Sequence, residues 1–263
     1  LEACESNLTS TGVVVRSTIT EPLIERNPSS GELEPKLATE WSSDDDQTWT
    51  LKLREGVKFH DGSDFTAADA AATIDRAVNS KLGCNVEGYV FGDDDLKLKV
   101  VDDYTLEVTA VKKDPILPLR LSFLEVVPEE TSATEKVREP IGTGPYQIDD
   151  WKAGQSIDVS AYADYWGEAP SFAKANYQWR SEGSVRAAMI TSGEADIATG
   201  LSPEDNIGEL GVSYPNNETV ALRMHNDKAP LNDERVRRAI NYAIDKESIV
   251  ASLYGGRDKA AAQ

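Results

Sequence analysis

Residues 48–69 read TWTLKLREGVKFHDGSDFTAAD and place a strand pattern directly before a helix start. Apolar and polar residues alternate over 48–54, which predicts a half-buried strand whose inward face carries Trp49, Leu51 and Leu53. After a turn at Asp61-Gly62, Thr66 stands three positions before Asp69, the spacing of a helix capping box. Apolar residues then recur at helical spacing to position 77, so we expect a helix there. This order of elements indicates a mixed α and β protein.

The same patterns continue on both sides of this stretch. Alternation at 96–100 and 104–108 predicts one hairpin, and 146–151 with 156–162 predicts a second. Beyond these, strands are expected at 177–180, 196–199 and 219–226. Helices are expected at 185–192, after Ser202-Pro203, from an Asn232 cap through Ile244, and over 246–254 after an Asp245 cap. The whole pattern predicts an α/β or α+β fold with mixed sheets.

The composition excludes several classes of partner. The chain has 263 residues, of which 40% are hydrophobic, and its 46 acidic against 27 basic residues give a net charge of −19. A negative field of this size repels phosphate backbones, so no nucleic-acid partner is expected. No stretch approaches the roughly 20 apolar residues of a membrane span, so we expect no membrane insertion in this segment. The absence of an initiating Met and of a terminal element at either end leads us to expect a portion of a longer precursor.

The two cysteines leave three interpretations open. Cys4 and Cys84 can be separate buried thiols, can form a disulfide, or Cys4 can be lipid-modified, since LEAC at 1–4 is similar to the end of a bacterial lipobox. Two cysteines and two histidines, His60 and His225, are too few and too widely spaced for a zinc centre. We therefore expect no metal site.

No catalytic arrangement stands out in the sequence. The His60-Asp61 pair is better interpreted as a turn with a locally bonded imidazole than as a pair of metal ligands. The GTGP stretch at 142–145 lacks the Lys-Ser/Thr pair of a phosphate loop. No Gly-x-Ser-x-Gly elbow is present, and the acidic clusters fall in polar turns. These observations favour a binding protein without a cofactor over an enzyme.

Several blocks, in order, resemble the family 5 extracellular solute-binding proteins, the peptide/nickel-binding group of ABC importers. Each block is weak alone, but together they cover nearly the whole chain. They are EPKLATEW at 34–41, REGVKFHDG at 54–62, TAAD at 66–69, IGTGPY at 141–146, DYWG at 164–167, SGEAD at 192–196, NDERVRRA at 232–239 and YAID at 242–245.

The resemblance implies an α/β, periplasmic-binding-protein-like fold of class II with mixed sheets and an extra inserted subdomain, present here as a truncated N-terminal portion. Residues 1–33 and 142–220 are then the main domain of the first lobe, 34–141 its inserted subdomain, and 221–263 the incomplete start of a second lobe. Gly142, Gly144 and Pro145 are expected to shape the return crossing between domains.

The same resemblance implies a function. We expect an extracytoplasmic protein, at the periplasm or the outer face of the membrane, that captures a peptide or other small molecule between two lobes and delivers it to ABC permease subunits. A nickel chelate, an oligosaccharide, a sensory or chaperone-like role, and an enzyme on the same fold are the alternatives.

Specific residues follow from position in the family pattern. The side chains expected to face the ligand are Glu21, Phe123, Glu125, Arg223 and Asn226. Because the family is exported and only one pairing is available, the resemblance also implies a disulfide between Cys4 and Cys84.

Overall fold

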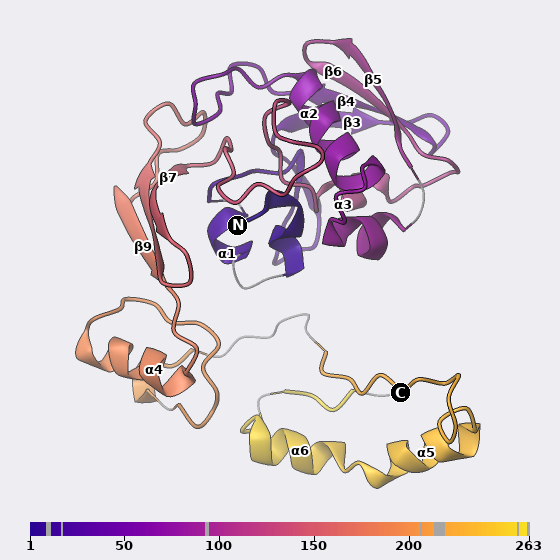
Figure 1. Ribbon diagram of the computed structural model, residues 1–263, viewed down its shortest axis with the longest axis vertical. Coiled ribbons are helices and arrows are strands. Elements are labelled where there is room, and N and C mark those ends of the chain that lie inside the picture. The colour runs from indigo at the N-terminus through magenta and orange to yellow at the C-terminus, as the bar shows by residue number, and fades with distance from the viewer. Residues whose placement is uncertain are drawn as a thin grey trace. The chain divides into compact units, whose positions relative to one another are not determined.

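The structure, a computed structural model, describes residues 1–8, 12–16, 18–92, 95–205, 207–212, 219–256 and 258–261. The chain divides into two compact units, a first unit of Leu1–Gln178 and a second unit of Trp179–Gln263. Figure 1 colours both units along the chain, and each is described here by itself.

The first unit holds all the sheets of the described chain. Its strands are β1 (Ile24–Arg26), β2 (Leu33–Pro35), β3 (Ala38–Ser42), β4 (Thr48–Leu53), β5 (Lys97–Asp102), β6 (Thr105–Thr109), β7 (Tyr146–Lys152), β8 (Ser156–Ala161) and β9 (Lys174–Gln178). Its helices and helical turns are η1 (Ala3–Leu8), α1 (Gly12–Val15), α2 (Ala67–Ile74), η2 (Asp75–Asn79), η3 (Glu87–Phe91) and α3 (Leu117–Leu121).

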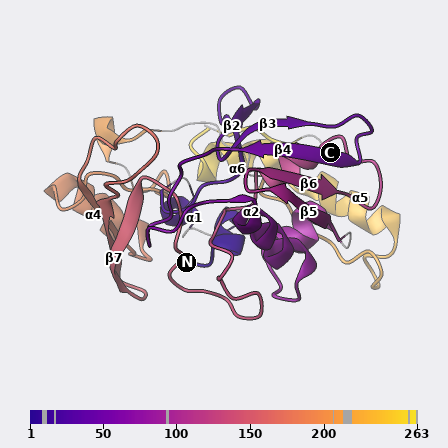
Figure 2. The ribbon, with the colours of Figure 1, turned by 90° about the horizontal axis from the view of Figure 1, so that it is seen from above.

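A four-stranded antiparallel sheet in the order β3-β4-β6-β5 forms the main wall of this unit. Leu51 of β4 pairs with Leu106 of β6, and both side chains are fully buried. Helix α2 packs against β5 and β6, as Figure 2 shows. The apolar core between them includes Phe59, Phe65 and Ile74. The strand over 48–54 and the first hairpin are therefore confirmed.

The capping box at the start of α2 is also confirmed. The Thr66 hydroxyl accepts a hydrogen bond from Ala68 N at 3.2 Å, and the Asp69 carboxylate accepts one from Thr66 N at 2.8 Å. The helix expected to reach position 77 continues from α2 into the wider winding of η2.

A second sheet of the first unit has the order β7-β8-β9, which confirms the second hairpin. The strand expected at 177–180 is present as β9, which begins three positions earlier and ends two positions earlier. Its pairing with β8 ends at Ser156 opposite Gln178, where β8 itself begins. Residues after Gln178 therefore have no neighbour in the ladder, and the strand stops there.

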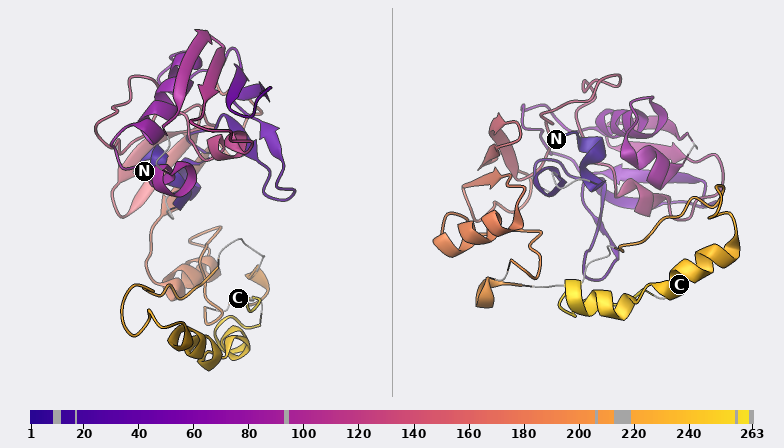
Figure 3. Two further views of the ribbon diagram at one scale, coloured as in Figure 1. Left: turned by 90° about the vertical axis from the view of Figure 1, so that its right-hand side faces the viewer. Right: turned by 60° about the horizontal axis from the view of Figure 1, so that its bottom comes forward.

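The second unit is helical where its structure is regular. Its elements are α4 (Gly183–Ser192), the turn η4 (Gly208–Leu210), α5 (Glu234–Ala243) and α6 (Lys246–Leu253). Gly193, with a left-handed φ of 74°, ends α4 as expected. Asp245 caps α6, whereas α5 is capped by Asp233 and not by Asn232. Figure 3 shows α5 and α6, in yellow, following one another along the chain.

Three other predictions for the second unit are wrong. Residues 196–199 and the described residues of 219–226 form no strand. Within the described part of 179–263 there is no strand at all, so an extended segment there has no neighbour to complete its backbone hydrogen bonds. Ser202-Pro203 begins a turn and not a helix: Asp205 accepts hydrogen bonds from Ser202 N at 3.1 Å and from the Ser202 hydroxyl at 3.0 Å, and residues 203–204 lie in a turn.

Candidate functional site

Two of the predicted ligand-facing residues, Glu21 and Glu125, are brought together by the backbone of the first unit. Pro22 and Glu125 form an antiparallel bridge, and Val126 N donates to Glu21 O at 3.0 Å. Both side chains are buried, with exposures of 0% and 2%. A pair of carboxyl groups in such a place requires compensating partners.

Glu21 has a full set of protein partners. Its carboxylate accepts hydrogen bonds, each of 2.8 Å, from Thr143 Oγ1, Tyr165 Oη and Trp166 Nε1. Lys36 Nζ lies 3.2 Å from the same group. Although burial alone would lower the pKa of Lys36, the carboxylates of Glu21 and Glu25 raise it, so the ammonium stays charged. Glu21 thus ties together segments far apart in sequence and fixes the 18–22 loop.

The return segment at 142–145 packs directly on this loop. A Cβ on Gly142 would lie 2.0 Å from Ile19 O, and one on Gly144 would lie 2.4 Å from Thr18 O, so only glycine fits at either position. Gly144 N in turn donates to Ile19 O at 2.9 Å. The glycines therefore serve close backbone packing.

His60 also contacts the return segment at 142–145. Its Nε2 lies 2.9 Å from Gly144 O, and Gly142 N donates to its Nδ1 at 3.4 Å. Burial lowers the pKa of His60, which matches a neutral ring that accepts at Nδ1 and donates at Nε2. The expected imidazole bond is present, but the expectation of a local partner is wrong: the fold places the return segment beside the ring.

Glu125 differs from Glu21 in its partners. Thr20 Oγ1 donates to Glu125 Oε2 at 2.9 Å, while Arg16 Nε lies 3.5 Å from Oε1. Oε1 is the buried side-chain oxygen without a hydrogen bond among the residues that the structure describes. Burial raises the pKa of Glu125 to about 8, so the group carries a proton at neutral pH.

Arg16 and Phe123 border this carboxyl group. The Arg16 guanidinium lies 6.0 Å from the centre of the Phe123 ring and donates to Ser122 O at 3.4 Å. Its side chain is 34% exposed. Arg16 was not among the predicted site residues, although a single basic residue after the apolar run at 13–15, shortly before Glu21, was the available signal.

The five predicted ligand-facing residues therefore fall into two groups. Glu21, Phe123 and Glu125 lie close together in the first unit. Arg223 and Asn226 belong to the second unit and are exposed on backbone that forms no strand. Their place in a ligand site stays a prediction.

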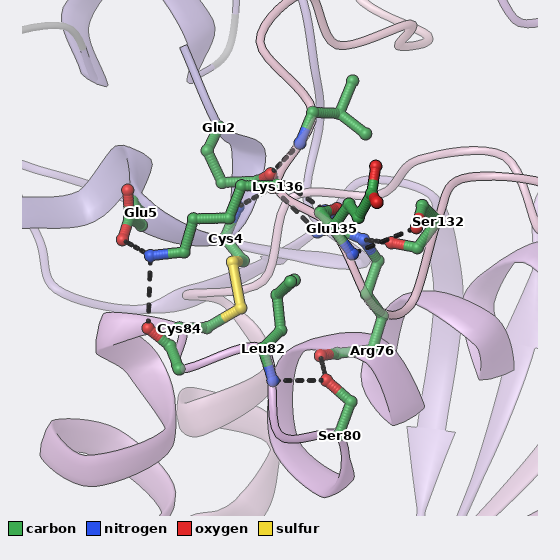
Figure 4. Close-up of a disulfide and its surroundings, with 12 residues drawn as sticks. Glu2, Cys4, Glu5, Arg76, Ser80, Leu82, Cys84, Ser132, Glu135 and Lys136 are labelled. Atoms are coloured by element: carbon green, nitrogen blue, oxygen red, sulfur yellow. Dashed lines mark hydrogen bonds and ion pairs between the residues drawn. A yellow bond between two sulfur atoms is a disulfide. The ribbon is translucent and has the colours of Figure 1, made fainter.

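The disulfide between Cys4 and Cys84 is present (Figure 4), which selects one of the three interpretations of the cysteines. It is accompanied by a buried ion pair in which Arg76 donates to both oxygens of Glu2, at 2.7 and 2.9 Å. Glu2 also accepts from Val137 N at 2.6 Å. Burial opposes ionisation of Glu2, but the Arg76 guanidinium lowers its pKa overall. The bond and the pair together fix the N-terminal segment to η2 and to the 132–137 loop.

The described ranges contain no group of three or more His, Cys, Asp or Glu residues that could hold a metal ion. No helix in them combines the length and the hydropathy that crossing a membrane requires.

Comparison with known proteins places these features in a family. The family model described as "Bacterial extracellular solute-binding proteins, family 5 Middle" matches residues 32–263. The glutathione-binding protein GsiB of Escherichia coli K12 is 33% identical over 230 residues, which cover 81% of this chain and 44% of that protein. The chain thus spans about half the length of the curated relatives it matches.

Solved structures agree with this result. An ABC transporter substrate-binding protein from Sinorhizobium meliloti is 30% identical with a TM-score of 0.72, over 94% of this chain and 53% of that one. NikA from Brucella suis, in complex with Fe(III)-EDTA, is 26% identical with a TM-score of 0.75, over 92% of this chain and 52% of that one. The expected periplasmic-binding-protein fold is therefore confirmed, and the chain belongs to the family 5 bacterial extracellular solute-binding proteins.

Proposed function

We propose that this chain is part of an extracytoplasmic binding protein that captures a small peptide or peptide-like molecule and delivers it to the permease of an ABC importer. The observation that carries the proposal is the family match over residues 32–263, to which the GsiB relatives add a peptide-like ligand, glutathione. Within the protein, residues 1–33 and 142–220 form the main domain of a first lobe. Residues 34–141 form its inserted subdomain, and 221–263 begin a second lobe.

The geometry of the first unit supports a binding role. A solute-binding protein needs polar groups held in place before the ligand arrives, and not a nucleophile with a matched acid and base. Glu21 fixes the 18–22 loop through four partners, and Gly142 and Gly144 lock the return segment on it. Arg16 and Phe123, which border the Glu125 carboxyl group, then offer a guanidinium and an aromatic face. The guanidinium suits a carboxylate, which every free peptide carries.

A metal chelate is the second candidate. The similarity to NikA from Brucella suis, crystallised with Fe(III)-EDTA, favours it. A chelate of this kind carries carboxylate groups, as a peptide does, so the same guanidinium can bind either ligand. The two ligands differ in the metal ion and in the peptide amine.

Native mass spectrometry of the protein purified from its host tests the proposal. We expect a bound species with the mass of a short peptide or of glutathione. Calorimetric titration of the emptied protein with glutathione, a dipeptide and Fe(III)-EDTA then ranks the candidates, and glutathione or the dipeptide should bind most tightly. Binding of an oligosaccharide in place of all three would contradict both candidates.

A further inference from the structure

The starting observation is the environment of Glu125 Oε1. This oxygen is buried and accepts no hydrogen bond from the part of the chain that the structure describes, although nine in ten or more buried polar groups in proteins are bonded. An ionised carboxylate there would lack a full set of donors, which is costly in a buried place. A proton on Glu125 removes most of that cost.

The backbone prevents the side chain from escaping to solvent. Pro22 and Glu125 are bridged, and Arg16 is bridged to Thr20, so both segments that carry the group are fixed. The charged groups facing Glu125 are Arg16 from the end of α1 and the carboxylates of Glu21 and Glu25. Thr20 donates a hydrogen bond to the Glu125 carboxyl group, the one side-chain bond to it among the described residues. These neighbours are held in place. The change that pH makes in this cluster is therefore the gain or loss of the proton on Glu125.

Arg16 lies between the buried Glu125 carboxyl group and solvent. Its Nε is 3.5 Å from Glu125 Oε1, while its side chain remains 34% exposed and so can be reached by a solute. When Glu125 is ionised, it attracts the guanidinium and cancels its charge locally. When Glu125 is protonated, it no longer competes for the guanidinium, which keeps its other contacts, among them the bond to Ser122 O, and can also attract an anion from solvent.

We propose that Arg16 and Glu125 form a proton-linked subsite for a carboxylate of the ligand, in which Arg16 binds the anion and Glu125 sets its affinity by holding or releasing a proton. The inference rests on the proposed function and deepens it, since it selects ligands that carry an exposed carboxylate. The charges balance: at alkaline pH the ligand carboxylate replaces the Glu125 carboxylate beside Arg16, and Glu125 takes up one proton from solvent. Raising the pH therefore weakens binding.

Calorimetric titration with glutathione at pH 6, 7, 8 and 9 tests the linkage. We expect little change between pH 6 and 7 and a loss of affinity of roughly tenfold or more between pH 7 and 9, as uptake of one proton requires. At pH 8.5, titration in two buffers with different ionisation enthalpies should show proton uptake by the wild-type protein. Equal heats in the two buffers would overturn the proposal without any variant.

Variants identify the groups responsible. Glu125→Gln keeps the neutral shape and should bind glutathione with little dependence on pH, whereas Arg16→Gln should lose most of the binding at pH 6. Glu107→Gln is the matched control, because Glu107 pairs with Lys99 on the exposed side of the β5–β6 hairpin and should leave the pH profile unchanged. Circular dichroism confirms that each variant is folded.

The outcomes separate this inference from the proposed function. Tight binding of glutathione that is equal from pH 6 to 9 and insensitive to Arg16→Gln would overturn the subsite and leave the binding role intact. Failure of glutathione, the dipeptide and Fe(III)-EDTA to bind at any pH would overturn both.

Discussion

The two units of this chain have similar apolar patterning but very different burial. In the first unit Leu51 of β4 and Leu106 of β6, with Phe59, Phe65 and Ile74, are at zero exposure. In the second unit α5 and α6 bury none of their described residues, and Ile249 and Leu253 are 41% and 60% exposed. An apolar stripe therefore stabilises a helix or strand only where the topology supplies a facing surface.

The disulfide belongs wholly to the first unit and gives the largest expected effect. Replacing Cys4 and Cys84 with serine removes a bond that spans 80 positions. Chain-entropy arithmetic for such a loop gives about 4.5 kcal/mol of lost stability. Chemical denaturation measured by the fluorescence of Trp41 and Trp49 should show this loss.

The second unit provides the internal control for this experiment. Hydrogen exchange in α5 and α6 should be the same in the serine variant and in the wild type, because the bond does not reach them. A matching loss of protection in α6 would show that the two units unfold together, and the contrast between them would have to be abandoned.

The second-largest loss of stability is expected when one partner of a buried ion pair is removed. Glu2→Ala leaves the Arg76 guanidinium, whose side chain is 4% exposed, without its carboxylate partner. Breaking such a buried pair costs about 3–5 kcal/mol. The matched variant in the second unit is Glu234→Ala, which removes the exposed i,i+4 pair with Arg238 and should cost less than about 0.5 kcal/mol. Equal losses in urea denaturation would contradict the difference in burial between the two ion pairs.

The same contrast explains which predictions from sequence succeeded. The α2 capping box depends on two residues three positions apart, and the strand over 48–54 finds pairing partners in β3 and β6, so both predictions are confirmed. The strand expected at 219–226 depends on a pairing partner that local alternation cannot reveal, and no strand forms. Element type was thus predictable where local pattern and tertiary contact agreed.

The candidate site shows a similar limit. Position in the family pattern selected Glu21 and Glu125, which do lie together. That Glu21 is fully occupied by Thr143, Tyr165 and Trp166 depends on contacts across 122 to 145 positions. The sequence alone has no signal for such contacts, and for the Arg16 guanidinium beside Glu125 it offers only a single basic residue after the apolar run at 13–15.

Core truncation compares the units directly. Leu51→Ala in β4 removes a side chain at 0% exposure and should cost about 2–5 kcal/mol. Leu253→Ala in α6 changes a side chain that is 60% exposed and should stay within about 0.5 kcal/mol. Thermal unfolding of both variants measures the difference. A large loss for Leu253→Ala would mean that α6 is packed in solution against a surface which covers that leucine.

The smallest effect comes from the helix caps, where the two units are locally alike. Thr66 caps α2 by accepting from Ala68 N, and Asp245 caps α6 by accepting from Ser248 N at 2.9 Å. Substituting either with alanine removes the side-chain acceptor of a backbone amide at a helix start, at a cost of about 1 kcal/mol. The consequences should still differ. Helix α2 is packed on its sheet, so Thr66→Ala should lower the denaturation midpoint of the whole first unit. Helix α6 has no buried face among its described residues, so Asp245→Ala should instead reduce helical circular dichroism and speed hydrogen exchange within α6, with the midpoint of the first unit unchanged.

Thr66→Ser and Asp245→Asn, which keep a capping oxygen, should restore most of each loss. If Asp245→Ala shifted the first unit's midpoint as Thr66→Ala does, packing and not local capping would govern both helices.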